Sequence, residues 1–203
     1  MNEAVKRAIP ASLEGTGVVS PIISLNDAVS NMERILRLVI GENIDLVMDL
    51  DPALGAVKAD TIQIYQVLLN LAVLARNTLA AKLLIETRNL ELLEPQDCCL
   101  DKAPPGSYVV LSVSNDCIST PLEILAHIFE PISTTKAMGH GSGLGLSTVY
   151  WIVRQSGGYL QVLSHFGEGT SFKIYLPQLQ EAVGSRRAEI VANDTVSNRY
   201  DNL

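Results

Sequence analysis

The stretch Gly139-His140-Gly141-Ser142-Gly143-Leu144-Gly145-Leu146 stands directly before a segment that we expect to be helical over 144–155. Glycines let backbone N–H groups approach an anion, and the N-terminus of a helix adds a partial positive charge. Lys136, a few residues earlier, can add a full charge to a phosphate. Alternating glycines that run into a helix favour an anion-binding loop. A flexible loop with a glycine cap fits this stretch as well, so the motif alone leaves both interpretations open.

A second informative segment starts at Asp60 or Thr61 and is expected to be helical to about Ala80. It is apolar nearly all round, and its polar residues recur at three- and four-residue steps on one face: Gln63, Gln66, Asn70 and Asn77. Leu74 occupies the missing position of that series. A buried helix normally satisfies such a stripe with a ligand, a partner or water. A helix at the edge of the core, with its stripe in solvent, is the alternative that periodicity leaves open.

The rest of the pattern mixes helices and strands. Asn26 is expected to cap a first helix that ends at Gly41, and Pro121 opens a short helix that runs to Phe129. The proline-containing stretch between the segments 82–92 and 108–114 is expected to be a loop. Five segments are predicted strands, the last two joined as a hairpin through Gly167-Glu168-Gly169: 44–50, 82–92, 108–114, 159–164 and 170–176. These elements predict an α/β fold, a two-layer α/β sandwich with a mixed sheet and helices on one face.

Composition narrows the class of protein. The 203 residues carry a formal net charge of −7, which argues against a general nucleic-acid binder. The chain lacks a long apolar run, so we expect no direct membrane insertion and a cytoplasmic location. Residues 1–21 are expected to be a linker or a truncated remnant, 22–177 one domain, and 178–203 a disordered tail. The three cysteines suit a reducing compartment; we interpret Cys98 and Cys99 as ordinary side chains.

Several separated motifs, taken in order, resemble one family. They are Asn70 on a helix, Phe129-Glu130-Pro131, Thr134-Thr135-Lys136, Gly141-x-Gly143-Leu144-Gly145-Leu146 and Gly169-Thr170-x-Phe172. This order resembles the histidine kinase branch of the gyrase, Hsp90, kinase and MutL ATPases. The resemblance implies a Bergerat fold that holds ATP and Mg²⁺ between the polar-striped helix, the loop after a strand end and a mobile lid. It implies these nucleotide-binding residues, with Asn70 also at the metal: Asn70, Asn115, Lys136, Gly141, Gly143, Leu144, Gly145 and Thr170.

The chain departs from the family pattern at the metal and adenine positions. The asparagine that ligates magnesium in the family falls on Leu74, which offers no oxygen ligand. The adenine-binding Asp-x-Gly-x-Gly pattern aligns with Asn115-Asp116-Cys117-Ile118-Ser119, so an uncharged amide replaces the carboxylate. Asp116 is one residue out of register and is expected to point to the other side of the strand end. Cys117 is interpreted as a steric plug rather than a reactive thiol.

The sequence also bears on phosphoryl transfer. None of His127, His140 and His165 stands in the context of the family's phosphoacceptor histidine, and no two-helix hairpin fits before residue 25. We expect a domain of two-component signal transduction with weak or no ATP binding and no catalytic residue of its own. A sensor kinase's helical hairpin or a response regulator is the expected partner, and a monomer the expected state. The alternatives are an active Mg-ATP-dependent domain that phosphorylates a histidine on a separate chain, and a fragment severed from a longer kinase.

Overall fold

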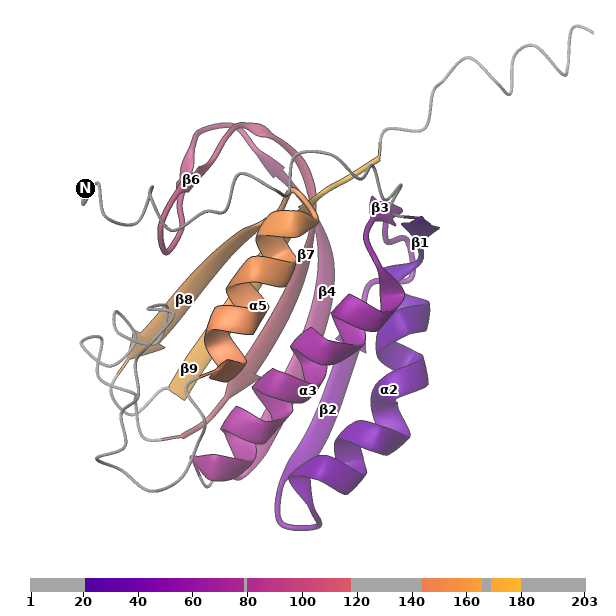
Figure 1. The fold of residues 1–203 in the computed structure, drawn as a ribbon, viewed down its shortest axis with the longest axis vertical. Helices are drawn as coiled ribbons and strands as arrows, with labels where there is room; N and C mark the ends of the chain where they lie inside the picture. Colours follow the sequence, from indigo (N-terminus) through magenta and orange to yellow (C-terminus); the bar gives the residue numbers. More distant parts are fainter. Residues whose placement is uncertain (1–20, 79, 118–143, 166–168, 180–203) are drawn as a thin grey trace, which may run out of the picture.

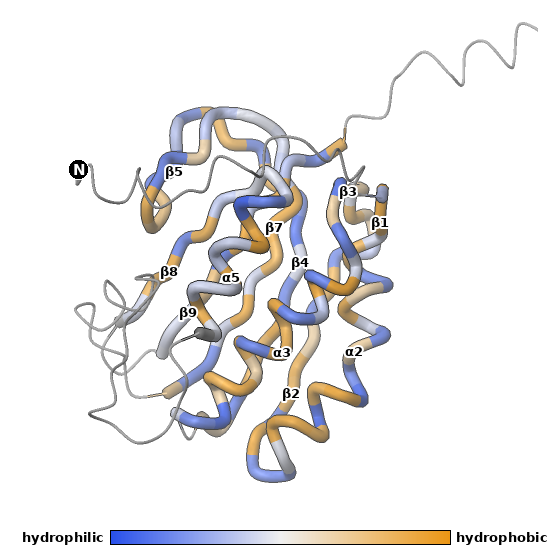
Figure 2. Tube along the Cα trace, viewed as in Figure 1, coloured by the Kyte–Doolittle hydropathy of each residue, from blue (hydrophilic) through white to orange (hydrophobic). Residues whose placement is uncertain are grey.

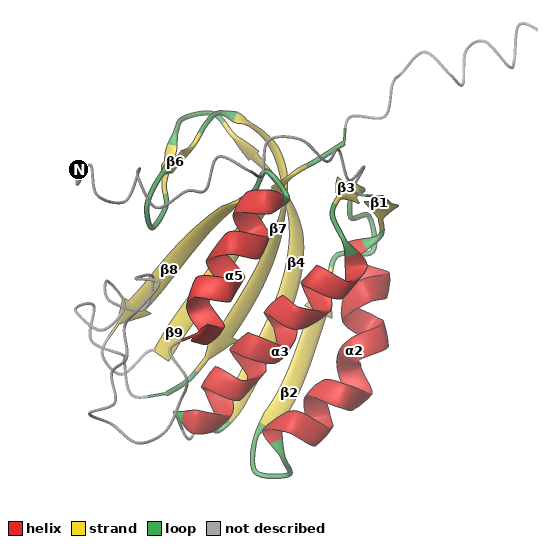
Figure 3. Cartoon of the chain, in the orientation of Figure 1, coloured by secondary structure: helices red, strands yellow, loops and turns green. Residues whose placement is uncertain are grey.

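The computed structural model of the chain describes residues 21–78, 80–117, 144–165 and 169–179. Within these residues, three helices lie side by side on one face of a five-stranded sheet (Figures 1 and 3). The helices are α2 (Leu25–Ile40), α3 (Thr61–Asn77) and α5 (Leu144–Gln155). The α/β sandwich predicted from the sequence is therefore confirmed.

The main sheet has the strand order β2-β4-β7-β9-β8. Its strands are β2 (Asp45–Leu50), β4 (Lys82–Leu92), β7 (Gly106–Asn115), β8 (Tyr159–His165) and β9 (Gly169–Pro177). The β2–β4 pair is parallel, because helix α3 crosses over between them, and the other three pairs are antiparallel. The sheet is therefore mixed, as the sequence predicts, and β8 pairs with β9 as predicted.

Two small pairs of strands lie outside the main sheet. One joins β1 (Ile22–Ile23) to β3 (Val57–Lys58), and the other joins β5 (Gln96–Asp97) to β6 (Lys102–Ala103). The second pair corrects the prediction of a loop between β4 and β7. Two-residue strands carry no alternation that a sequence pattern could detect, so only their pairing reveals them. We call residues 93–105 the insert.

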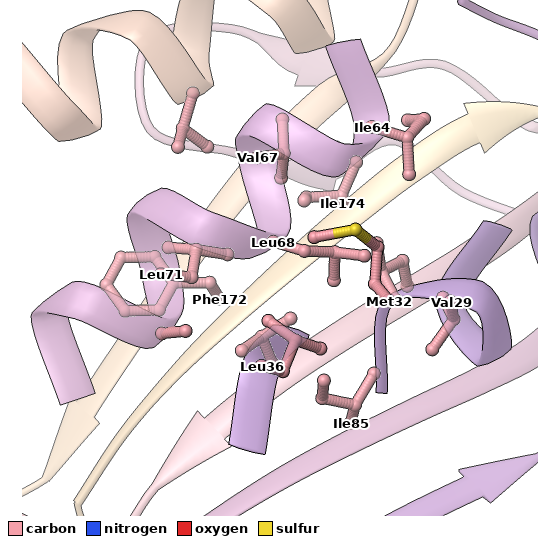
Figure 4. Close-up of a cluster of buried hydrophobic side chains, with 14 of the residues drawn as sticks. Val29, Met32, Leu36, Ile64, Val67, Leu68, Leu71, Ile85, Phe172 and Ile174 are labelled. Atoms are coloured by element: carbon pink, nitrogen blue, oxygen red, sulfur yellow. The ribbon is translucent and has the colours of Figure 1, made fainter. Parts of the chain in front are cut away.

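The core fills the space between the helices and the sheet (Figure 4). Apolar residues alternate along the strands and recur on the buried face of α2, and Figure 2 shows them as orange segments between blue polar ones. Val109, Leu111 and Val113 of β7 point to the helices, and so does Asn115 at the end of the strand. The core contains these fully buried side chains: Leu36, Leu68, Leu71, Ile85, Phe172 and Ile174. The antiparallel pairing thus places the end of β7, at Asn115, beside the start of β9, at Thr170.

The N-caps of α3 and α2 test the capping residues predicted from the sequence. Asp60 caps α3 as predicted, since its Oδ1 accepts from the N–H of Ile62 at 2.8 Å. The predicted cap of α2 was wrong: Ser24 is the N-cap, and its hydroxyl accepts from the N–H of Asp27. Asn26 instead donates to the carbonyl of Asp51 at 2.7 Å and ties the helix to the end of β2. Both residues are good caps, so the tertiary contact decides between them.

Several predictions fall outside the described residues. These include the N-terminal linker, the short helix after Pro121, the turn residues Gly167 and Glu168, and the tail beyond residue 179. Within the described part, Gln178 and Leu179 continue past β9 and donate to the carbonyls of Ser107 and Ala56. No helix in the described part of the chain is long and apolar enough to cross a membrane.

Candidate functional site

The polar stripe of α3 meets helix α5 at two points. The amide Nδ2 of Asn70 donates to the carbonyl of Gly145, in the first turn of α5, at 3.2 Å. The amide of Gln63 donates to Gln155, in the last turn of α5, at 2.9 Å. Gln66 is exposed. The stripe is therefore partly satisfied by α5 and partly by solvent, so each of the two interpretations left open by the sequence accounts for part of it.

Leu74 lies one helical turn beyond Asn70 on the same face of α3. Its side chain is half-buried and packs against the main core. Mg²⁺ requires about six oxygen ligands in near-octahedral geometry. Asn70 can offer one oxygen, Leu74 offers none, and no group of three or more His, Cys, Asp or Glu within the described residues could hold a metal ion. Of these two positions on α3, only Asn70 therefore offers an oxygen ligand.

The end of β7 forms the second part of the site. Asn115 is buried and is paired with Leu83 of β4 on one side and Thr170 of β9 on the other. The backbone N–H of Cys117 donates to Asn115 Oδ1 at 3.3 Å, which closes an Asx-type turn. Thr170 is buried next to it, with its Oγ1 3.1 Å from the hydroxyl of Ser164. Asn115 and Thr170 are thus two buried polar residues that face each other across the end of β7 and the start of β9.

Cys117 is buried in the same patch and packs against the main core. Its Sγ lies 3.9 Å from Thr170 Oγ1. The side chain fills space beside Asn115 and touches one hydroxyl, so its observed contacts are those of a packing residue. The interpretation of Cys117 as a steric plug in the nucleotide site stays a prediction.

Asp116 points away from the site, as its position in the strand alternation predicts. Its Oδ1 accepts from the N–H of Ala81 at 2.8 Å and of Lys82 at 2.9 Å. These bonds hold the short connection between α3 and β4 against the end of β7. The backbone of Gly169 also lies close to this end of β7. Its φ is +96°, and a Cβ at this position would overlap the carbonyl of Asn115. Only glycine fits there.

Cys98 and Cys99 lie in the insert, far along β7 from this patch. Cys98 packs with the small cluster of Tyr108 and Tyr175, whereas Cys99 packs against the main core. Burial raises the pKa of Cys99 to about 11, so its thiol stays protonated near neutral pH. Neighbouring cysteines that pack in separate clusters and resist ionisation act as ordinary side chains, as the sequence indicates.

The insert also reaches α5, which the sequence did not predict. Asp101 pairs with Arg154 at 3.3 Å and accepts from the hydroxyl of Tyr150 at 3.4 Å. The N–H of Cys99 donates to the carbonyl of Leu160 on the edge strand β8. Helix α5 is thus held by Asn70 at its start and by the insert near its end. The partners are about 50 residues apart in the chain, and no local pattern signals such a pairing.

Of the predicted site residues, Asn70, Asn115, Gly145 and Thr170 lie in the described structure: Asn70 bonds to Gly145 between α3 and α5, and Asn115 pairs with Thr170 between β7 and β9. For Leu144 only the backbone is described, as the first residue of α5. The other predicted site residues lie outside the described residues: Lys136, Gly141 and Gly143.

Comparison with known families agrees with this geometry. The model of the Histidine kinase-, DNA gyrase B-, and HSP90-like ATPase family matches residues 59–180, more than half of the chain. The chain belongs to this ATPase family. The match includes all the described site residues, from Asn70 on α3 to Thr170 on β9.

Within this ATPase family, the chain is similar to sensor histidine kinases of two-component systems. It is 37% identical over 175 residues to the sensor kinase CckA of Brucella abortus (strain 2308), covering 85% of this chain and 18% of that protein. It is 28% identical over 173 residues to the sensory histidine kinase/phosphatase NtrB of Rhizobium leguminosarum bv. phaseoli, covering 79% of this chain and 42% of that protein. The chain therefore spans less than half the length of these relatives.

Solved structures show the same fold. The catalytic domain of histidine kinase ThkA, in a nucleotide-free form, superposes with a TM-score of 0.55 at 25% identity, covering 79% of this chain and 98% of that one. Full-length ShkA, determined in complex with AMPPNP, superposes with a TM-score of 0.64 at 22% identity, covering 85% of this chain and 34% of that one. The fold is that of histidine kinase ATP-binding domains.

Proposed function

We propose that this chain is a nucleotide-binding domain of a two-component sensor kinase that binds ATP weakly and without a tightly held magnesium ion. The observation that carries the proposal is Leu74, which packs into the core one turn beyond Asn70 where a second polar ligand is expected. A metal ion that requires oxygen ligands gains nothing from a leucine side chain, and the leucine makes its surroundings less polar.

The state of Asn70 supports the same proposal. Its Nδ2 is already bonded to the carbonyl of Gly145, so only Oδ1 remains for a ligand. At the other wall, Asn115 presents an uncharged amide, and hydrogen bonds to charged groups are the stronger ones. Each lost polar interaction weakens binding by about 1–3 kcal/mol. Two such losses convert a site of about micromolar affinity into one of about millimolar affinity.

Phosphoryl transfer within this chain is not part of the proposal. His127 and His140 lie outside the described residues, and His165 ends strand β8. The domain would act on, or through, another segment or chain: a sensor kinase's helical hairpin or a response regulator. The relatives are much longer than this chain, which supports a role inside a larger signalling assembly. A cytoplasmic, monomeric domain remains our expectation.

Isothermal titration calorimetry with ATP, in the presence and absence of Mg²⁺, tests the proposal. We expect a Kd of about 1 mM that magnesium changes by less than about threefold. The double variant Leu74→Asn with Asn115→Asp restores an amide at the metal wall and a carboxylate at the other wall. In the presence of Mg²⁺ it should bind ATP about tenfold or more tightly than the unmodified chain, and without Mg²⁺ the gain should be smaller, because only the carboxylate then contributes.

Ile62→Asn is the matched control, because it places the same amide on an exposed position of α3. It should leave both affinities unchanged. Micromolar, magnesium-dependent binding by the unmodified chain would overturn the weak-binding proposal. That result would favour the second candidate, an active domain that phosphorylates a histidine on a separate chain.

A further inference from the structure

Helix α2 lies at the edge of the helix layer, and its outward face carries two apolar side chains (Figure 1). Ile35 is 46% exposed and Leu38 is 83% exposed. Together with the exposed residues Asn31 and Arg34 they recur at steps of three and four residues, so these side chains form one stripe along the helix. The exposed face of a helix is usually charged or polar. The core does not account for these two apolar residues, because α2 contacts it through the opposite face.

The stripe borders a groove of about 820 Å³ at the C-terminal end of α2. Arg34, Ile35 and Leu38 line the groove from the helix. Glu42 lines it from the turn that follows, and Asp45 from the first residue of β2. Along the helix axis, a basic residue therefore comes first, apolar side chains follow, and acidic residues come last. The groove has an apolar centre and opposite charges at its two ends.

The charges at the two ends are not used inside the domain. Arg37, the neighbouring base, pairs with Glu33 of the same helix at 2.9 Å. Within the described residues, the side chains of Arg34 and Glu42 form neither an ion pair nor a hydrogen bond. Opposite charges in one groove disfavour a uniformly charged ligand such as a nucleic acid. They favour a protein surface that places an acid opposite Arg34 and a base opposite Glu42.

A second copy of this chain offers that surface. If two α2 helices lie antiparallel about a two-fold axis between Ile35 and Leu38, Ile35 of each copy faces Leu38 of the other. The same axis brings Arg34 of each copy to within about one helical turn of Glu42 of the other, which the long arginine side chain can span. Because the contact is isologous, each of these pairs forms twice.

We propose that the outward face of α2 is a self-association surface that pairs two copies of this domain. The proposal goes beyond the proposed function and does not depend on nucleotide binding. Two apolar side chains and one exposed ion pair from each copy make a small interface, so we expect a Kd of about 1 mM. The isolated chain is then monomeric at micromolar concentration, as expected above. Two copies held in one assembly reach an effective concentration of about millimolar, at which the contact forms.

Sedimentation equilibrium of the full chain, from about 10 μM to about 1 mM at low salt, tests the proposal. About half of the unmodified chain should be dimeric at about 1 mM, and almost none at about 10 μM. Leu38→Ala should weaken pairing about fivefold or more, because apolar area next to the axis is lost from both copies. Ile62→Ala shortens a similarly exposed apolar side chain on α3 and should leave pairing unchanged.

The charged residues give the sharper test. Arg34→Glu alone sets acid against acid at both contacts, and Glu42→Arg alone sets base against base, so each variant should pair about tenfold or more weakly. In an equal mixture of the two variants every acid faces a base again, and pairing should return to that of the unmodified chain. Lys58→Glu and Glu91→Arg make the same changes in net charge at exposed positions outside α2. These controls should show neither the loss nor the recovery.

Each outcome decides the proposal. A chain that stays monomeric at about 1 mM and low salt overturns it. A dimer that Arg34→Glu leaves intact also overturns it, because another face would then form the contact. A mixture that fails to recover overturns it as well, because Arg34 would not face Glu42. Titration of the monomeric Arg34→Glu variant with ATP tests the proposed function separately.

Discussion

The two ends of strand β7 are built in different ways. At its start, Tyr108 lies under the insert and meets the rings of Tyr159 and Tyr175 edge-on, each at 6.2 Å. The insert then continues round the edge of the sheet to α5 through Asp101. At its finish, Asn115 bonds within its own turn and leaves Nδ2 without an acceptor among the described residues.

The contrast shows how one strand serves two purposes. At the start of β7, the hydroxyl of Tyr108 donates to the carbonyl of Pro104 and its ring packs with the aromatic rings of β8 and β9, which is what a scaffold requires. The finish has a close backbone approach at Gly169, which holds a positive φ against the carbonyl of Asn115, and such backbone strain is a feature of functional sites. Three substitutions test whether the two ends really differ in this way, from the largest expected effect to the smallest.

Gly169→Ala should be the most damaging change, because it breaks the finish of β7 directly. The new Cβ combines a positive φ with overlap of the Asn115 carbonyl, so β9 and β7 must separate locally. We expect a loss of about 3 kcal/mol or more in the free energy of unfolding, measured by urea denaturation.

Gly41→Ala is the matched control for that change. Gly41 also has a positive φ, +82°, but no atom lies within 4 Å of the added Cβ. It should lose only about 1 kcal/mol, the cost of backbone strain alone. If the two variants were equally destabilised, the close approach of β9 to Asn115 would not account for the loss of unfolding free energy in Gly169→Ala.

Asp116→Ala should have an intermediate effect at the same end. It removes the carboxylate that accepts two backbone N–H groups, at Ala81 and Lys82, and we expect a loss of about 1–2 kcal/mol in urea denaturation. Asp116→Asn keeps an Oδ1 acceptor and should recover more than half of that loss. Equal losses for Ala and Asn would indicate that charge, rather than the two hydrogen bonds, accounts for the effect.

Asp101→Asn should have the smallest effect, at the start of β7. The pair with Arg154 is more than one-third exposed, so we expect about 0.5 kcal/mol or less in unfolding free energy. A more sensitive readout is the fluorescence of Trp151, the only tryptophan of the chain, which is 54% exposed on α5 beside Tyr150. If the insert holds α5 in place, the emission maximum of Trp151 should shift in the Asp101→Asn variant.

Asp97→Asn is the control for this variant. Asp97 pairs with Lys102 inside the insert, and both side chains are well exposed. Its replacement should leave the emission of Trp151 unchanged. A shift of equal size in both variants would mean that the emission follows the net charge of the insert rather than the contact with α5.

The sequence by itself determined the layers, the order of the strands along the chain and the central helices. Hydrophobic residues alternate along 108–114 and form one face of α2, because the hydrophobicity of each side chain decides whether it is buried. The resemblance to the family also implies that Leu74 and Asn115 stand in its metal and adenine positions, and this assignment stays a prediction. The direction of Asp116 followed from the alternation of the strand.

Only the tertiary structure decided the partners of the polar groups. Ser24 rather than Asn26 caps α2, because β2 supplies a better partner for Asn26. The insert holds α5 through Asp101, and Asn70 meets Gly145 across 75 positions of the chain. Asn115 Oδ1 accepts from the N–H of Cys117 in the turn that follows β7. Burial is a property of each residue, whereas a hydrogen bond requires two groups at one distance and angle, which only the folded chain supplies.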